Sequence, residues 1–128
     1  MGTKKLSAGV KHSKKKKSLR KELDKKLQSI GRKMYDRCLV CGGEYSCLHH
    51  YYTKGSSTYL RYDLNNCIPL CVGCHFKHHN GNPDIHNAVN DIMGIEWREA
   101  LKERRMEGIG FKPTLKWYKD IEIIFEEL

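Results

Sequence analysis

Residues 38–79 read CLVCGGEYSCLHHYYTKGSSTYLRYDLNNCIPLCVGCHFKHH and contain all six cysteines and five of the seven histidines of the chain. Two C-x-x-C pairs stand in this stretch, Cys38 with Cys41 and Cys71 with Cys74. Two such pairs a few tens of residues apart are typical of a zinc site, because each tight turn points two thiolates at one ion and tetrahedral zinc needs four ligands. The sequence therefore predicts a structural zinc ion held by these four cysteines.

The alternative is a pair of disulfides in a secreted protein. Residues 1–30 lack the continuous apolar core of a signal peptide. We therefore expect a cytoplasmic protein, whose thiols stay reduced. The two remaining cysteines, Cys47 and Cys67, are expected to pack as small apolar residues on strands, with a ligand role for either as the alternative.

The length of 128 residues predicts one modest domain with a small core, so that zinc binding should contribute to folding. No stretch of 18 apolar residues is present, which argues against a membrane partner. The net charge of +9 is uneven: residues 1–34 carry 13 Lys or Arg and two acidic residues, whereas residues 35–128 carry 11 basic and 13 acidic residues. A basic N-terminal segment suits nucleic acid, with a solubilising tail as the alternative.

The chain divides into four segments. Residues 1–17 are predicted to be a disordered basic arm, because the run Lys14–Lys17 repels itself. Residues 18–34 are predicted to be a basic amphipathic helix ending near Gly31, whose apolar stripe should pack while its lysines face phosphate; the stripe is Leu19, Leu23, Leu27 and Ile30. Residues 35–82 form the zinc-braced core, and residues 83–128 a helical extension.

Within the core, residues 46–52 and 67–70 are expected to be strands, with Pro69 at an edge, and residues 59–62 a short extended segment. A helix starting near Cys71 or Val72 places His75 and His79 on one face. The extension should contain three helices, one from Pro83 to Gly94, one over residues 96–107 and one over residues 113–128; Trp97, Leu101 and Met106 are expected to be buried. The fold class is therefore α+β.

The order of these residues resembles the HNH endonuclease motif: His49-His50 on a strand, a loop, Asn66, a second strand, then Cys71-x-x-Cys74-His75-x-x-x-His79. The resemblance covers about a third of the chain and implies a ββα-metal fold of two strands and a helix around a metal ion. The segments 60–63 and 81–82 are similar to phage NinG/Rap-type recombination nucleases, although those proteins place Asn where this chain has His75. A phage origin would put the protein in the host cytoplasm.

The resemblance also implies roles. His50 matches the general base that activates water, and His49 matches the metal ligand before it. Asn66 matches the residue that orients the base or pins the loop, and His75 and His79 match the helical ligand positions, with their relative importance left open. The catalytic ion is implied to be Mg²⁺ or Mn²⁺, and the substrate DNA.

The residues fit this chemistry on physical grounds as well. Hydrolysis of a phosphodiester needs a deprotonated water and a cation on the phosphate oxygens, and histidine is a natural base at neutral pH. Adjacent strand residues point to opposite faces, so His49 and His50 can serve one site only where the strand ends or bulges. The candidates for DNA contact are Tyr51, Tyr52, Lys54 and Arg61, with a core position as the alternative for the two tyrosines. His78 is expected to be exposed or near phosphate. Two rival functions are a non-catalytic zinc finger that binds DNA or RNA and a protein-interaction zinc domain.

Overall fold

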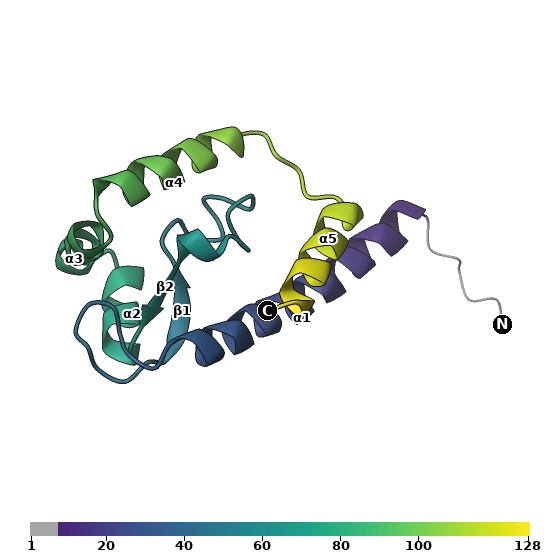
Figure 1. Ribbon diagram of the computed structural model, residues 1–128. Helices are drawn as coiled ribbons and strands as arrows, with labels where there is room; N and C mark the ends of the chain where they lie inside the picture. The colour runs from purple at the N-terminus through teal and green to yellow at the C-terminus, as the bar shows by residue number, and fades with distance from the viewer. Residues whose placement is uncertain (1–7) are drawn as a thin grey trace.

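A computed structural model describes residues 8–128, and Figure 1 shows how they are arranged. The elements in chain order are α1 (Ala8–Met34), β1 (Cys47–His50), a 3₁₀ turn (Leu64–Asn66), β2 (Cys67–Leu70), α2 (Val72–His79), α3 (Pro83–Met93), α4 (Ile95–Glu107) and α5 (Leu115–Glu126). The described chain thus has the mixed α+β character predicted from the sequence. Its small sheet contacts α1 through β1 and contacts α2 through both strands.

The sheet is an antiparallel pair in which Leu48 lies opposite Pro69 and His50 opposite Cys67. The outer edge of β1 is closed by a glutamine of α1: the Leu48 amide donates to Gln28 Oε1 at 2.9 Å, and Gln28 Nε2 donates to the Leu48 carbonyl at 3.0 Å. The outer edge of β2 carries Pro69, which has no amide to donate, and its carbonyl accepts from the Leu39 amide at 2.8 Å. Gln28 and Leu39 therefore satisfy the outward-facing backbone groups of Leu48 and Pro69 without a third strand.

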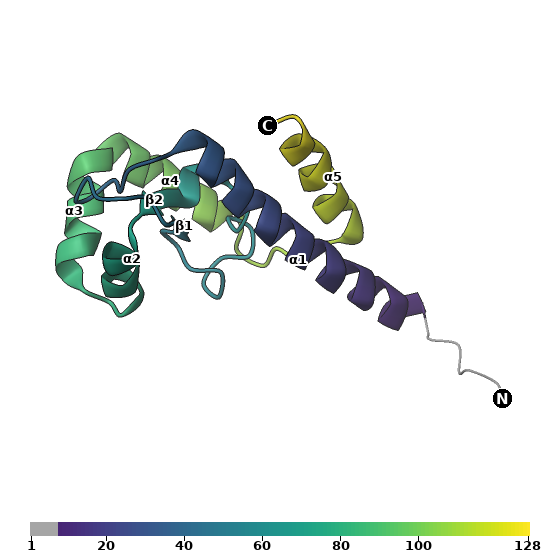
Figure 2. The ribbon, with the colours of Figure 1, turned by 90° about the horizontal axis from the view of Figure 1, so that it is seen from below.

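The first helix is longer than the sequence predicted, because α1 begins at Ala8 and not at Ser18. Residues 8–17 of the predicted disordered arm are helical, and residues 1–7 lie outside the described part of the chain. Lysine is a good helix former, and repulsion between exposed like charges costs only ~0.2–0.5 kcal/mol per pair, so the lysine run does not break the helix. Figures 1 and 2 show the N-terminal end of α1 projecting beyond α5.

Gly31 does not end α1, as had been expected, but lies inside it and lets the helix approach the sheet. A Cβ at position 31 would come within 2.5 Å of Leu48 Cγ. The helix continues through Gly31 to Met34, and the space beside Gly31 is filled by Leu48 of β1 and by Tyr45 of the preceding loop. Glycine is required here by close packing and not by a turn.

Two hydrophobic clusters stabilise the fold. The first includes Cys38 and Cys74 and joins the sheet, α2, α3 and α4. Its most buried members are Leu60, Ile68, Leu70, Val89 and Leu101. The second joins α1, β1 and α5, and contains Leu23, Leu27, Ile30, Leu48, Tyr62, Tyr118 and Phe125. The apolar stripe of α1 therefore packs, as predicted.

The C-terminal helices follow the predicted boundaries closely, with Pro83 at the start of α3 and Gly94 between α3 and α4. Two expectations were wrong. Met106 is 60% exposed, because α4 turns mainly Leu101 toward the core, and residues 59–62 form turns and not an extended segment. None of the helices between residues 8 and 128 is long and apolar enough to cross a membrane.

The packing at Gly31 gives a direct stability test. We expect Gly31→Ala to lower the free energy of unfolding by about 1–3 kcal/mol, because the new methyl group overlaps Leu48. Gly73→Ala in α2 is the control, since nothing lies within 4 Å of its added Cβ. Denaturant unfolding of both zinc-loaded variants measures the difference, and equal stability of the two would show that α1 and β1 are not packed this closely.

Candidate functional site

Four thiols converge where the loop before β1 meets the start of α2. The Sγ atoms of Cys38, Cys41, Cys71 and Cys74 all lie within 4.8 Å of one another, and those of Cys41 and Cys71 are 3.6 Å apart. Tetrahedral zinc with Zn–S bonds of 2.3 Å requires sulfur atoms about 3.8 Å apart. The four residues therefore fit a metal ion such as zinc in number, chemistry and spacing.

The backbone around the cysteines is shaped for this cluster. The Cys38 amide donates to the Gly43 carbonyl at 2.8 Å, and Gly42 closes the turn with φ +70°, a conformation that favours glycine. Cys71 caps α2 by accepting from the Cys74 amide at 3.4 Å. Burial alone would raise the pKa of Cys38, but backbone hydrogen bonds lower it to about 7, which favours its thiolate. Burial and the neighbouring thiols raise the pKa of Cys74, so a metal ion is needed to deprotonate the whole cluster.

The other two cysteines stand apart from this group. Cys67 is buried in β2, donates from Sγ to the Asp63 carbonyl at 3.4 Å, and has its pKa raised to about 12 by burial. Cys47 is half-buried in β1, and burial raises its pKa as well. Both side chains therefore lie on strands as protonated, weakly polar residues.

Beside the cysteine cluster, a hollow of about 420 Å³ is lined by four of the histidines singled out in the sequence. They are His49 and His50 of β1, and His75 and His79 of α2. β1 ends at His50, and the chain bends at Tyr51, which allows two adjacent strand residues to line one hollow. Lys54 of the following loop is the cation on its wall.

His50 is buried and held in one orientation. Its Nε2 lies 2.7 Å from the Arg61 carbonyl oxygen. A carbonyl can only accept, so Nε2 carries the proton and Nδ1 keeps its lone pair. Burial lowers the pKa of His50, against the effect of the Arg61 carbonyl, and so favours the neutral imidazole. A neutral ring with a free Nδ1 is the form that can take a proton from water.

The carbonyl that holds His50 is fixed in turn by α1. The Arg61 guanidinium binds Asp24 through two bonds, Nε to Oδ1 at 3.1 Å and Nη2 to Oδ2 at 2.6 Å. The Tyr62 hydroxyl donates to the same Oδ1 at 3.1 Å. Burial would raise the pKa of Asp24, but Arg61 and Tyr62 hold it below its ordinary value. The side chain of Arg61 is thus used inside the protein, whereas the sequence suggested a contact to DNA.

Asn66 is fully buried and pins the loop that separates the two strands. Its Oδ1 accepts from the Tyr52 amide at 2.8 Å, and its Nδ2 donates to the carbonyls of Tyr52 and Leu60 at 3.0 and 3.2 Å. These three bonds satisfy a buried amide that would otherwise destabilise the core. All three bonds go to the backbone of the loop at Tyr52 and Leu60.

His49 lies between two histidines of α2. Its ring centroid is 4.6 Å from that of His75 and 4.5 Å from that of His78, and its Nε2 is 2.7 Å from His78 Nδ1. His79 lies farther out, with its ring centroid 6.2 Å from that of His75. Burial, together with the neighbouring imidazoles, lowers the pKa of His49 to about 3, so the ring is neutral at pH 7 and able to bind a metal.

His78 was missed as a member of this group, because the sequence suggested an exposed position. Its spacing from His75 could have found it, since residues three apart share a helix face. Between residues 8 and 128, the four cysteines are the sole set of three or more His, Cys, Asp or Glu residues whose ligand atoms all lie within 4.8 Å of one another. If the histidines bind a metal, the hydrogen bond between His49 Nε2 and His78 must therefore be replaced by a bond from His49 to the metal.

Comparison of the chain with protein-family models, curated proteins and solved structures gives no match. The interpretation of the hollow therefore depends on its residues and their geometry.

The cysteine cluster predicts a metal-dependent fold. We expect Cys74→Ser to lose its bound zinc and most of its cooperative thermal unfolding, because zinc binding supplies folding free energy in a domain of this size. Cys47→Ser should keep one zinc ion per chain, since Cys47 is outside the cluster. Metal analysis and thermal melts of both variants test this, and a Cys74→Ser protein with full zinc content would contradict it.

The contact between α1 and the loop predicts a tautomer effect. We expect Asp24→Asn to loosen the Arg61 carbonyl, so that His50 changes from the Nε2-protonated form to a mixture of both tautomers. The ¹⁵N chemical shifts of the imidazole report the change directly. Asp120→Asn is the control, because it breaks an exposed ion pair with Lys116 far from His50, and an identical spectrum for the two variants would argue against the link.

Proposed function

We propose that the protein is a metal-dependent endonuclease of the HNH type that hydrolyses phosphodiester bonds of DNA. The support is the hollow in which His50 presents a free Nδ1 on one side, while His49, His75 and His79 present imidazoles on the other. A base and a set of imidazole ligands around one space are what metal-assisted phosphodiester hydrolysis requires.

In this proposal His50 takes a proton from water through Nδ1 as the water oxygen attacks phosphorus. The P–O3′ bond breaks as the new P–O bond forms, which leaves a 5′-phosphate and a 3′-hydroxyl protonated from solvent. His49, His75 and His79 would hold Mg²⁺ or Mn²⁺, which supplies a positive charge to the phosphate oxygens and the leaving oxygen when bound. Three protein ligands would leave coordination positions open for substrate.

Two other residues prepare the site without touching the reacting atoms. Asn66 holds the loop backbone at Tyr52 and Leu60, close in sequence to Arg61. Arg61, fixed by Asp24, presents the carbonyl that selects the tautomer of His50. Both are positioning residues in this account, because a base must be held within hydrogen-bond reach of its water.

The charge distribution supports DNA as the substrate. α1 carries a run of lysines, with Lys14, Lys15 and Lys17 exposed, and Lys54 lines the hollow itself. A helix with this charge attracts a phosphate backbone without reading its sequence. Binding should therefore weaken as salt increases.

One observation favours a second candidate, a non-catalytic zinc-finger module that binds nucleic acid. His49 is hydrogen-bonded to His78 at 2.7 Å, and so the imidazoles are not already arranged as a ligand set. In that case the cysteine cluster and the basic helix would serve nucleic-acid binding without catalysis. Binding of DNA without cleavage across several divalent ions would support this candidate over the nuclease.

The nuclease proposal is tested by a cleavage panel on linear, nicked and branched DNA with added Mg²⁺ or Mn²⁺. We expect the wild-type protein to cut or nick DNA and His50→Ala to lose at least about 10²–10⁴-fold in rate, the usual contribution of a general base. Asn87→Ala is the control, because Asn87 is exposed on α3 and outside the hollow. Unchanged cleavage by a zinc-loaded His50→Ala protein would overturn the proposal.

A further inference from the structure

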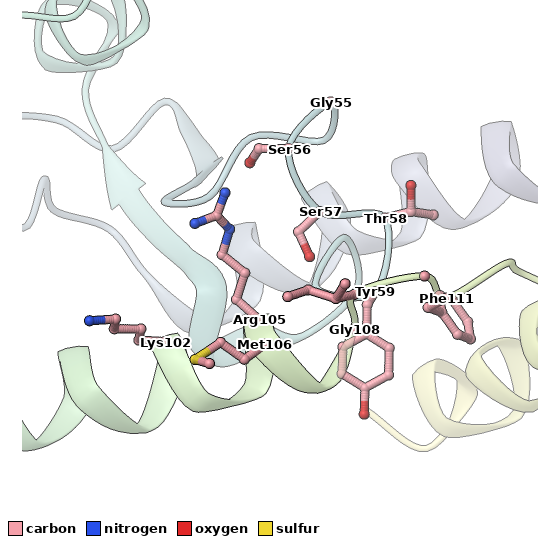
Figure 3. A pocket seen from close by; sticks show the side chains of 12 residues that line it. Gly55, Ser56, Ser57, Thr58, Tyr59, Lys102, Arg105, Met106, Gly108 and Phe111 are labelled. Atoms are coloured by element: carbon pink, nitrogen blue, oxygen red, sulfur yellow. The ribbon is translucent and has the colours of Figure 1, made fainter.

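A second cavity lies on the other side of the loop that borders the histidine hollow. It has a volume of about 410 Å³ and is enclosed by residues 55–59 of that loop and by the end of α4 with the turn after it. Figure 3 shows the loop above the cavity and α4 below it. Gly55 lines both this cavity and the histidine hollow, so the two spaces are neighbours across one short segment of backbone.

One end of the cavity is polar and positively charged. Figure 3 shows the Arg105 guanidinium rising from α4 toward Ser56, with the Ser57 hydroxyl directed into the space below the loop. The guanidinium lies over the Tyr52 ring, 4.8 Å from its centroid, which holds it in place while leaving its N–H groups available. Ser57 Oγ accepts from the Leu60 amide at 3.3 Å, and its own proton is free to donate.

The charge at this end is not neutralised within the described residues. Arg104, the neighbour of Arg105, is bound to Asp63 at 2.6 Å, but no ion pair to Arg105 is formed between residues 8 and 128. The lining of the cavity contains Lys102 as a second cation and no acidic residue. An arginine with free donors beside hydroxyl groups is suited to a phosphate group.

The other end of the cavity is apolar and aromatic. The rings of Tyr59 and Phe111 are in edge-to-face contact with centroids 5.2 Å apart, and Ile109 is 79% exposed beside them. Gly108 allows the turn to lie against Tyr59, since a Cβ there would come within 2.5 Å of the tyrosine Cβ. Aromatic side chains at this end of the cavity are suited to stacking with a planar base.

We propose that this cavity binds one unpaired nucleotide of the DNA strand next to the bond that is cut, with its phosphate at Arg105 and its base at Tyr59 and Phe111. The inference extends the nuclease proposal by naming the substrate class. A base inside a continuous duplex is stacked and paired. Such a base could enter the cavity only if the free energy of unstacking and unpairing it were supplied. The preferred DNA therefore contains unpaired nucleotides, as single strands, flaps and branches do.

The test is a binding measurement with the zinc-loaded full chain and no added Mg²⁺ or Mn²⁺. The probes are a fluorescein-labelled oligothymidylate and a blunt duplex of the same length, followed by fluorescence anisotropy. Arg105→Ala should weaken binding of the single strand about tenfold by removing a charged phosphate contact. Phe111→Leu, which keeps an apolar side chain but removes the aromatic face, should weaken it about five- to tenfold. Neither variant should change binding of the duplex by more than about twofold.

Lys119→Ala is the control, because it removes one exposed positive charge on α5, away from the cavity. The proposal is overturned if Arg105→Ala loses no more affinity for the single strand than Lys119→Ala, or if both cavity variants weaken single-strand and duplex binding equally. No cleavage is needed for this readout. A failure here with an active nuclease would therefore reject the nucleotide cavity alone, and selective single-strand binding by a protein that never cuts would reject the nuclease alone.

Discussion

The cluster of four cysteines is the constraint on which the rest of the structure depends. Cys38 and Cys41 precede β1, whereas Cys71 and Cys74 open α2, so the cluster ties the strand that carries His49 and His50 to the helix that carries the other imidazoles. A core of this size supplies little stability beyond its entropic cost. A metal such as zinc at the thiols would therefore hold the two halves of the histidine hollow at a fixed separation.

The second constraint is the line of contacts that runs from α1 to His50. Asp24 binds Arg61, and the Arg61 carbonyl binds His50, so a side chain of α1 helps to determine which nitrogen of the imidazole is free. A half-buried, bidentate, charge-assisted pair is stronger and better oriented than an exposed one. This gives α1 a structural role in addition to any contact with nucleic acid, so residues 8–34 are not simply an appended arm.

The sequence predicted the parts of this arrangement that depend on local spacing. The two C-x-x-C pairs indicated the cysteine cluster. The i, i+4 spacing of His75 and His79 placed these residues on one helix face, and both lie on α2. It could not predict the Asp24–Arg61 pair, because the partners are 37 residues apart and no local pattern links them. The position of His78 beside His49 and the packing at Gly31 also depend on tertiary contacts. The run of lysines suggested disorder, but the helix propensity of lysine exceeds the repulsion between its neighbours, and α1 begins at Ala8.

The proposed nuclease requires imidazoles from β1 and α2 to hold a divalent ion beside His50. Anomalous X-ray diffraction from crystals soaked in manganese tests it directly, since the ion is located without reference to activity. We expect one manganese peak in the hollow, bound by His49, His75 and His79, with the hydrogen bond between His49 and His78 broken. A hollow without a manganese peak at saturating metal, with His49 Nε2 still bonded to His78 Nδ1, would contradict it.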